Sequence, residues 1–378
     1  MSGELAARGP VWAVIAGGGT GGHVVPAVAI GKALVERGHP AGTIHFVGSK
    51  RGIEGRLVPA AGFELTLLPG RGIARRLTLD NLGAVLGLMS ALVRAVALLR
   101  RLRPAVVITV GGYASVACAT AAAILRIPLV VAEQNAVPGL ANRLAGRFAR
   151  ACAVSFEGTP LPRAVYTGNP VRAEIVEIDR SQSGREKARE SLGIPPGRIV
   201  VAVAGGSLGA RRINEATVGL AHLWGSRADV AIRHVVGERD FEQISAGAPE
   251  PPAGGLVYQL VRFEERMDLL LTAADIAVQR AGASTVAELA VAGVPSVLIP
   301  LPGAPGDHQT MNAKRLADAG AAVLLPDAET DAGRLAAEIE HLSADRGRLE
   351  AMALAAKALG QPRAADSVAA LAEENARA

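Results

Sequence analysis

Short apolar runs rich in β-branched residues recur along the chain, and each is followed by a glycine-containing turn or by a helical pattern. Runs that stay apolar at successive positions are typical of parallel strands buried on both faces of a sheet. Their alternation with helical patterns predicts a doubly wound α/β fold. The expected strands are "VWAVIAGG" (11–18), "TIHFVGS" (43–49), "AVVITVGG" (105–112), "PLVVAEQN" (128–135), "RIVVAVAGG" (198–206), "AIRHVVGE" (231–238), "DIAVQRAG" (275–282) and "PSVLIPLP" (295–302).

The pattern restarts near the middle of the chain. The strand, glycine turn and helix of "VIAGGGTGGHVVPA" (14–27) recur in "VVAVAGGSLGARRINEA" (200–216), which predicts two similar halves. The polar segment between them is punctuated by glycine and proline, so we expect a hinge at 170–177. The expected parts are a flexible N-terminus (1–10), a first domain (11–172), a second domain (173–355) and a C-terminal helix (356–378) that crosses back to the first domain.

One apolar segment, "LGAVLGLMSALVRAVALL" (82–99), approaches the length of a membrane-spanning helix. Arg94 interrupts it, and a strand-like run follows directly after Pro104, as in an α/β layer. We therefore expect a helix that packs on the sheet and does not span a membrane.

The composition is that of a globular protein with anionic partners. Half of the residues are hydrophobic, a fifth are charged, and the net charge is +5. Aromatic residues make up only 3% and are not interleaved with basic ones, so we expect no nucleic-acid partner. Cys118 and Cys152 form neither a disulfide framework nor a metal-ligand spacing. The first ten residues lack the apolar core of a secretory signal, which favours a cytoplasmic chain.

Gly17, Gly19 and Gly22 fit the dinucleotide fingerprint G-x-G-x-x-G. That interpretation requires an acidic residue at the end of the second strand, whereas the strand ends in Gly48, Ser49, Lys50 and Arg51. An NAD-dependent dehydrogenase is thereby disfavoured. His23 falls in the first turn of the next helix, where the helix dipole favours a neutral imidazole that can accept a proton. A capping or packing histidine is the alternative.

In the second half, "RAGASTVAELAVAGVP" (280–295) places Thr285 and Glu288 at the spacing of a capping box. Alternatively, Glu288 on the first helical turn accepts hydrogen bonds from the hydroxyls of a ribose, while the helix N-terminus faces a diphosphate and Arg280 supplies positive charge. The residues of "GDHQTMNA" (306–313) suit sugar hydroxyls. Two domains facing each other across a cleft, with a nucleotide sugar held by the second, would explain these features. No D-x-D motif occurs, so we expect no metal.

In their order along the chain, seven motifs resemble those of the MurG family of peptidoglycan N-acetylglucosaminyltransferases, in glycosyltransferase family 28. They are "GGTGGH" (18–23), "GGY" (111–113), "EQN" (133–135), "GNPVR" (168–172), "GGSLGARRIN" (205–214), "RAGASTVAE" (280–288) and "DHQTMNA" (307–313). The resemblance spans 11–325. It implies a GT-B fold and transfer of N-acetylglucosamine, with inversion and without a cofactor, from UDP-GlcNAc to the 4-hydroxyl of the muramyl sugar of lipid I, giving lipid II.

The resemblance also implies roles for individual residues. The implied donor contacts are Thr20, Gly21, Gly22, Asn135, Arg172, Ser207, Ala283, Ser284, Thr285, Val286, Ala287, Glu288 and Gln309. In "RFEERM" (262–267), whose backbone would meet the uracil, Glu264 stands where the family usually has another residue. Arg280 is included among the expected donor contacts because of its positive charge. We expect His23 to act at the chemical step, either as the catalytic base or by orienting the acceptor and phosphate, with Glu133 and Asp307 as the alternative bases.

The family further implies a peripheral protein on the cytoplasmic face of the plasma membrane, and it admits partners among cell-wall synthesis proteins. We expect the segment 70–103 to dock on an anionic membrane surface, through Arg75 and Arg76 beside apolar side chains, with Tyr113 near the acceptor. The alternative is a helix that packs on the sheet with solvated arginines.

Rival functions share the same architecture. A UDP-GlcNAc 2-epimerase would need no lipid, and a glycosyltransferase acting on another lipid would differ only in its acceptor. A catalytically inactive nucleotide-sugar sensor would bind the donor without turnover.

Overall fold

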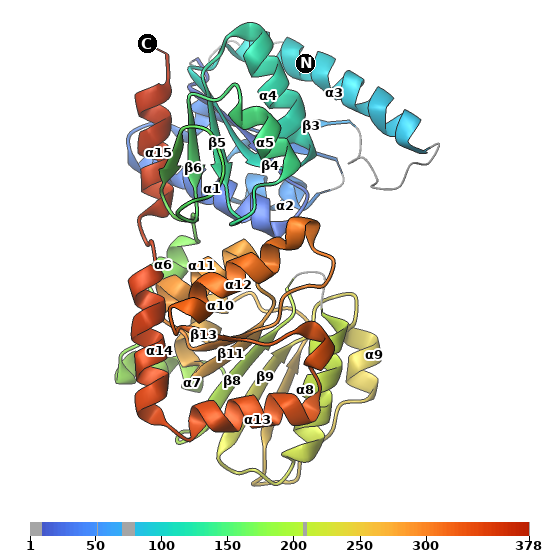
Figure 1. The fold of residues 1–378 in the computed structure, drawn as a ribbon, viewed down its shortest axis with the longest axis vertical. Helices are drawn as coiled ribbons and strands as arrows, with labels where there is room; N and C mark the ends of the chain where they lie inside the picture. Colours follow the sequence, from blue (N-terminus) through green and yellow to red (C-terminus); the bar gives the residue numbers. More distant parts are fainter. Residues whose placement is uncertain (1–9, 51, 70–79, 207–209, 378) are drawn as a thin grey trace. The chain divides into compact units, whose positions relative to one another are not determined.

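The chain folds into two compact α/β units. The computed structural model describes residues 10–50, 52–69, 80–206 and 210–377. Unit 1 comprises Met1–Arg172 and Pro362–Ala378, and unit 2 comprises Ala173–Gln361. Each unit is built on a parallel sheet with helices on its faces, which confirms the doubly wound fold (Figure 1).

The sheet of unit 1 has seven parallel strands in the order β3-β2-β1-β4-β5-β6-β7. The strands are β1 (Ala13–Gly17), β2 (Ile44–Ser49), β3 (Glu64–Leu68), β4 (Val106–Gly111), β5 (Leu129–Glu133), β6 (Ala151–Val154) and β7 (Ala164–Tyr166). The helices are α1 (Gly21–Glu36), α2 (Glu54–Ala60), α3 (Asp80–Leu102), α4 (Tyr113–Leu125), α5 (Leu140–Gly146) and α15 (Ala364–Asn375).

Successive side chains of these strands enter two different cores. Val14 and Ala16 pack with α3, α4 and α5, whereas Ala13 and Ile15 pack with α1, α2 and α15. This alternation is the strand period of two, and it makes both faces apolar. The result is two helical layers, an α3–α4–α5 layer and an α1–α2–α15 layer.

The sheet of unit 2 has six parallel strands in the order β10-β9-β8-β11-β12-β13. They are β8 (Ile199–Ala204), β9 (Val230–Val235), β10 (Val257–Val261), β11 (Ile276–Gln279), β12 (Ser296–Leu298) and β13 (Ala322–Leu324). The helices are α6 (Ala173–Val176), α7 (Gln182–Ser191), α8 (Arg211–Leu223), α9 (Phe241–Ala246), α10 (Met267–Ala273), α11 (Ala283–Ala292), α12 (His308–Asp318), α13 (Ala332–Ser343) and α14 (Arg346–Leu359).

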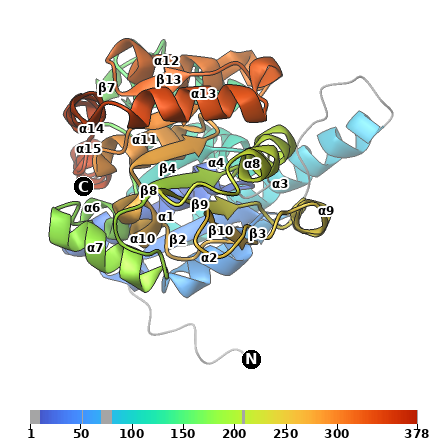
Figure 2. The same ribbon diagram turned by 90° about the horizontal axis from the view of Figure 1, so that it is seen from below.

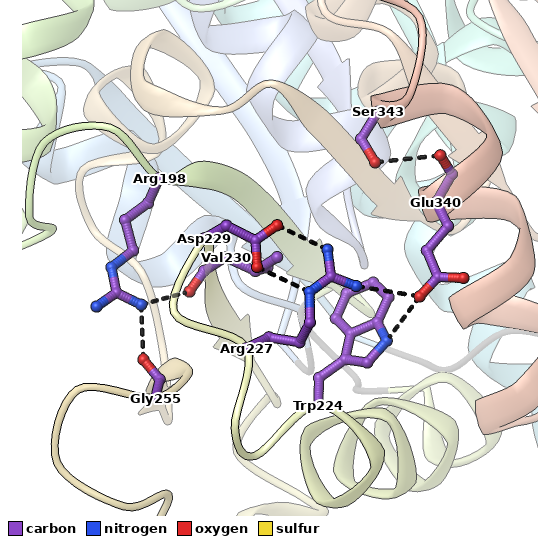
Figure 3. Close-up of polar contacts among 8 residues, drawn as sticks. All are labelled: Arg198, Trp224, Arg227, Asp229, Val230, Gly255, Glu340 and Ser343. Atoms are coloured by element: carbon purple, nitrogen blue, oxygen red, sulfur yellow. Dashed lines mark hydrogen bonds and ion pairs between the residues drawn. The ribbon is translucent and has the colours of Figure 1, made fainter.

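Helices α8 and α13 pack against one face of this sheet, through Ile213, Leu220, Leu335 and Ile339. Helix α7 lies along α10 and buries Ala188 in a smaller cluster (Figure 2). The end of unit 2 where β9 begins is held by polar side chains (Figure 3). There Glu340 accepts hydrogen bonds from Trp224 Nε1 at 3.2 Å and from Arg227 at 3.1 Å.

All eight predicted strands are present, while β3, β6, β7, β10 and β13 were not predicted. The apolar segment 82–99 belongs to α3, which buries Ala91, Ala95, Leu98 and Leu99 against its own unit. Within the described ranges, no helix has both the length and the apolarity needed to cross a bilayer.

Ion pairs join the C-terminal helix α15 to the C-terminal end of α1. Arg37 pairs with Asp366 and with Glu373, both at 2.7 Å. His39 contacts the second oxygen of Glu373 at 3.0 Å, and its ring stacks on Trp12. The apolar side of α15 buries Val368 and neighbouring alanines in the core. The chain therefore returns to unit 1 from Pro362 onward.

The Arg37 hydrogen bond, followed by that of His39, lowers the pKa of Glu373 below its ordinary value of 4.5. A carboxylate with a lowered pKa stabilises the fold above the ordinary value, and this stabilisation is lost as pH falls through the folded-state pKa. Glu373→Gln should therefore lower the melting temperature by about 1 to 3 °C near pH 7, and by less as the pH falls below about 4.

The matched control is Glu374→Gln, which removes the exposed neighbouring carboxylate of the same helix. Thermal denaturation of both variants over this pH range is the measurement. Equal melting temperatures near pH 7 would show that the Glu373 contacts do not stabilise unit 1.

Candidate functional site

In unit 1 the glycine-rich turn follows β1 and leads directly into α1. Thr20 is the N-cap of α1, and its carbonyl accepts hydrogen bonds from the amides of His23 and Val24, both at 3.1 Å. Gly18 and Gly19 have φ values of 149° and 101°, which favour glycine. His23 is thus the third residue of α1, and the amides of Gly21 and Gly22 precede it at the helix N-terminus.

The His23 ring lies close to Gly111, the last residue of β4. A Cβ built on Gly111 would lie 2.8 Å from His23 Nε2, and one built on Gly112 would lie 2.4 Å from the Gly18 carbonyl oxygen. Both residues also have positive φ values, 100° and 86°. The "GGY" motif therefore lets the β4–α4 turn touch both the imidazole and the backbone of the β1–α1 turn.

Several glycines of the β1–α1 turn serve this packing instead of lining a ligand site. A Cβ on Gly17 would lie 2.1 Å from a methyl group of Val110, and one on Gly18 would lie 2.4 Å from a carboxylate oxygen of Glu54. By contrast, Gly19 has open space, and Gly21 and Gly22 have no clash. The part of the turn with open space beside its glycines is therefore Gly19 to Gly22.

Glu133, an alternative catalytic base, is buried at the end of β5 and holds the loop that follows it. Its Oε1 accepts hydrogen bonds from the backbone and side-chain amides of Asn135 at 2.9 and 3.2 Å. Its Oε2 accepts from the amide of Gly139 at 3.0 Å and from Asn142 Nδ2 at 2.9 Å. Each oxygen already has two donors, so this carboxylate shapes the "EQN" loop and is poorly placed to take a proton.

The other predicted site residues of unit 1 that the structure describes include Tyr113 and Arg172. Tyr113 is the first residue of α4. Its hydroxyl is buried and has no hydrogen-bond partner among the described residues, and burial raises its pKa. Arg172 is the last residue of unit 1 before the chain enters unit 2. Arg75 and Arg76 lie outside the described residues.

In unit 2 the capping-box interpretation of "STVAE" is wrong. Helix α11 begins at Ala283 with Gly282 as its N-cap, so Thr285 is its third residue and Glu288 lies in the second turn instead of the first. The amide of Val286 is the first to bond within the helix, to the Gly282 carbonyl at 2.9 Å. The amides of Ala283, Ser284 and Thr285 therefore face the helix N-terminus, where an anionic group is favoured.

Side chains on α11 divide between the core and this end. Val286 is 2% exposed and packs inward, so only its backbone can meet a ligand. Ala287 is half-buried, and Glu288 is buried at 9% exposure. The Ser284 hydroxyl is buried without a hydrogen-bond partner among the described residues.

Arg280 is engaged within the protein. Its guanidinium donates to Asp327 at 2.6 Å and to the carbonyls of Ile299 and Pro300 at 3.2 and 3.1 Å. Asp327 also pairs with Arg212 at 3.2 Å. The charge of Arg280 is thus balanced by Asp327, and the residue pins the segment after β12 instead of offering a free cation.

Three further predicted residues of unit 2, Glu264, Gln309 and Asp307, also have internal partners. Glu264 pairs with Arg233 at 2.7 Å and accepts the Arg266 amide at 3.0 Å, which fixes the backbone after β10. Gln309 accepts the Leu301 amide at 2.9 Å, and exposed Asp307, at φ 51°, accepts from the Thr310 hydroxyl at 2.7 Å. Ser207 lies outside the described residues.

One functional candidate escaped the sequence analysis. Glu54 begins α2, is 1% exposed, and hydrogen-bonds the β1–α1 turn through the amide of Gly19 at 3.0 Å. An acidic residue therefore does lie close to the end of β2, although the strand end itself, Gly48 to Arg51, has none. Because this carboxylate is buried and bonded within the protein, it is not placed to read a ribose. The run "GIE" (52–54) was the available signal.

No cluster of three metal-ligating side chains occurs in the part of the chain that the structure describes. The N-termini of α1 and α11 are places in these residues where an anionic group is favoured.

Comparisons with known proteins identify this arrangement. Residues 13–154 match the glycosyltransferase family 28 N-terminal domain, and residues 200–368 match the family 28 C-terminal domain. Two relatives are named UDP-N-acetylglucosamine–N-acetylmuramyl-(pentapeptide) pyrophosphoryl-undecaprenol N-acetylglucosamine transferase. The protein from Alkalilimnicola ehrlichii is 43% identical over 96% of this chain and 99% of its own, and that from Desulforudis audaxviator is 39% identical over 94% and 96%.

Solved structures agree. MurG of Acinetobacter baumannii is 30% identical, with a TM-score of 0.75 over 97% of this chain and 100% of its own. A UDP-GlcNAc 2-epimerase from Neisseria meningitidis, 13% identical with a TM-score of 0.65 over 96% and 100%, shares the fold alone. Two doubly wound units with these neighbours define the GT-B fold. The chain belongs to the MurG family, within glycosyltransferase family 28.

The contact between His23 and Gly111 gives a prediction with a matched control. Gly111→Ala and Gly38→Ala both place a methyl group at a positive φ, 100° and 102°, but only the first meets the imidazole, because Gly38 has open space around it. Both should lose about 1 to 3 kcal/mol of stability to backbone strain.

Only Gly111→Ala should also lower the rate of sugar transfer, by about 100-fold, because the His23 ring must move. The measurements are thermal denaturation and initial rates well below the melting temperature. Equal rates for the two variants would show that the position of His23 does not matter for transfer.

Proposed function

We propose that this protein transfers N-acetylglucosamine from UDP-GlcNAc to the muramyl sugar of lipid I, producing lipid II for peptidoglycan synthesis. The observation that carries the proposal is the match, over nearly the whole chain, to relatives named for this reaction. The site geometry supports it, since α11 offers an anion-binding N-terminus followed one turn later by a buried carboxylate.

The donor would bind unit 2. Its diphosphate would meet the amides of Ala283, Ser284 and Thr285, and the ribose hydroxyls would donate to Glu288. The uracil would meet the backbone near Glu264, which the Arg233 pair holds in place. Because Arg280 is already paired with Asp327, we assign the charge of the leaving UDP mainly to the helix N-terminus.

The acceptor would bind unit 1, near the N-terminus of α1. Inverting transfer moves one proton: the 4-hydroxyl of the muramyl sugar loses it to a base as its oxygen bonds the anomeric carbon and UDP departs. We assign the base to His23. Glu133 has both oxygens occupied by donors, and Asp307 is an exposed residue of unit 2 bonded to Thr310.

A membrane-docking role is supported by the α3–α4–α5 layer, since the acceptor carries a long lipid. This layer exposes the apolar side chains of Met89, Val93, Ile124, Leu140, Leu144 and Phe148. Between Asn81 and Arg150 the sequence has eight arginines, all exposed, and one acidic residue, the buried Glu133. Apolar side chains interspersed with unopposed arginines suit an anionic lipid surface.

The apolar side chains of α5 and its end form one stripe. Leu140, Leu144 and Phe148 are spaced by four residues, with Arg143 and Arg147 beside them. Phe148 also borders a cavity of about 240 Å³, which Arg126 and Arg150 line together with Ile127 and Pro128. We propose that this layer docks on the cytoplasmic face of the plasma membrane, in a peripheral position.

The test of the function is a transfer assay with labelled UDP-GlcNAc and a short-chain lipid I analogue. We expect a disaccharide product in the presence of chelator, because no metal is required. Formation of a 2-epimer from the donor alone, without disaccharide, would instead establish an epimerase. Loss of activity in chelator that added metal restores would contradict the metal-free mechanism.

Glu288→Ala should weaken UDP-GlcNAc binding roughly 30- to 900-fold, equivalent to about 2 to 4 kcal/mol, because a buried hydroxyl pair loses its acceptor. No helix cap is lost, since Gly282 caps α11. Titration calorimetry measures the affinity. The control is Glu350→Ala, which removes an exposed carboxylate of α14. An unchanged affinity would remove Glu288 from the donor site.

Charge reversal on α5 tests the docking surface. Arg143→Glu with Arg147→Glu should weaken sedimentation with anionic vesicles by at least roughly 30-fold, at about 1 kcal/mol for each arginine lost, and leave UDP affinity unchanged. Lys32→Glu with Arg56→Glu makes the same change of charge at exposed sites of the α1–α2–α15 layer. Equal loss in the two double variants would indicate nonspecific electrostatics and would reject this surface.

A further inference from the structure

Glu54 is a buried carboxylate that accepts three hydrogen bonds from neutral donors among the described residues. Its Oε1 accepts hydrogen bonds from the Ser49 amide at 2.6 Å and from the Ser49 hydroxyl at 2.9 Å. Its Oε2 accepts the Gly19 amide at 3.0 Å. The side chain is 1% exposed, so these bonds compensate the cost of taking its charge out of water. One carboxylate thereby joins the end of β2 to the β1–α1 turn.

Three glycines make room for this carboxylate. A Cβ on Gly18 would lie 2.4 Å from its Oε1, one on Gly48 would lie 2.4 Å from its Cγ, and one on Gly52 would lie 1.8 Å from its Oε2. These glycines come from three segments: the β1–α1 turn, β2 and the β2–α2 turn. The surroundings of Glu54 are thus built to its shape, and a larger residue at any of the three positions would displace it.

The bond to Gly19 decides which amides a ligand can use. In a dinucleotide-binding unit the backbone of this turn faces the pyrophosphate. Here the Gly19 amide donates to Glu54, and a negative charge lies against the turn. A phosphate is therefore disfavoured at Gly19 and favoured at the amides of Gly21 and Gly22, which directly precede His23 in the first turn of α1.

We propose that Glu54 is a positioning residue for the acceptor: it holds the β1–α1 turn so that the phosphate of a lipid-linked acceptor binds at the N-terminus of α1, beside His23. The inference rests on the proposed function for the nature of the acceptor. Glu54 itself touches neither substrate nor the reacting atoms, and it acts through Gly19.

The first variant is Glu54→Gln, which keeps the shape and removes the charge. A glutamine has one acceptor oxygen, so its NH2 group must face at least one of the three donors. We expect binding of a fluorescent short-chain lipid I analogue, and kcat/KM for that acceptor, to fall at least about tenfold, with the UDP-GlcNAc Kd unchanged. Ser49→Ala is the structural comparison, because it removes one hydrogen bond to Glu54 and leaves the Gly19 bond intact.

A second pair of variants leaves Glu54 in place and serves if Glu54→Gln does not fold. Gly52→Ala pushes on the oxygen that holds Gly19, whereas Gly55→Ala has open space. We expect the acceptor defect in Gly52→Ala and not in Gly55→Ala. The positioning role is overturned if acceptor binding falls in proportion to the melting temperature, and does so equally, in Ser49→Ala and Glu54→Gln. It is also overturned if Gly52→Ala loses no acceptor binding.

The wild type separates this inference from the proposed function. If it binds the analogue but forms no disaccharide, the proposed reaction fails, and the variants still test the role of Glu54 through binding. If it neither binds nor glycosylates the analogue, both are overturned. If it does both and the variants match their controls, only the role of Glu54 is wrong.

Discussion

The organisation of unit 1 depends on backbone contact between the turns that follow β1 and β4. Gly112 can approach the Gly18 carbonyl only because it has no side chain, and Gly111 leaves room for the His23 ring for the same reason. The carboxylate of Glu54 fixes the turn after β1 by accepting a hydrogen bond from the Gly19 amide. The glycines that resemble a phosphate-binding fingerprint therefore have two structural roles. Some allow one turn to pack on another, and the rest leave the N-terminus of α1 open to a ligand.

Buried carboxylates set the shape of several loops in this protein. Glu54 holds the β1–α1 turn, Glu133 holds the loop after β5, and Glu264 holds the segment after β10. In each case the oxygens accept backbone amides that no strand or helix satisfies, which offsets the cost of burying the charge. A carboxylate used in this way is unavailable for proton transfer, and this leaves His23 as the better candidate base.

The two helical layers of unit 1 differ in the surface they present. In the α1–α2–α15 layer, Arg37 at the end of α1 forms ion pairs with Asp366 and Glu373 of the C-terminal helix. Among the described residues the α3–α4–α5 layer has no comparable ion pairs to a further helix, and its exposed apolar and arginine side chains lie on the outside of helices whose inner sides are alanine-rich. Small inner residues bring these helices close to the sheet, while the larger side chains point outward.

The sequence by itself determined the fold class and the strands buried on both faces, because eight apolar runs such as β4 and β8 need no partner information to be recognised. It also determined the family, through motifs whose order is specific. Only the tertiary structure decided the strands with exposed or half-buried residues, including β7 and β10, since their short patterns carry little apolar signal. It alone showed that Gly282 is the N-cap of α11, that Arg280 is paired with Asp327, and that Glu54 reaches the turn after β1. The physical reason is common to all three: the deciding partners are distant in sequence or lie in backbone geometry, and neither leaves a local pattern.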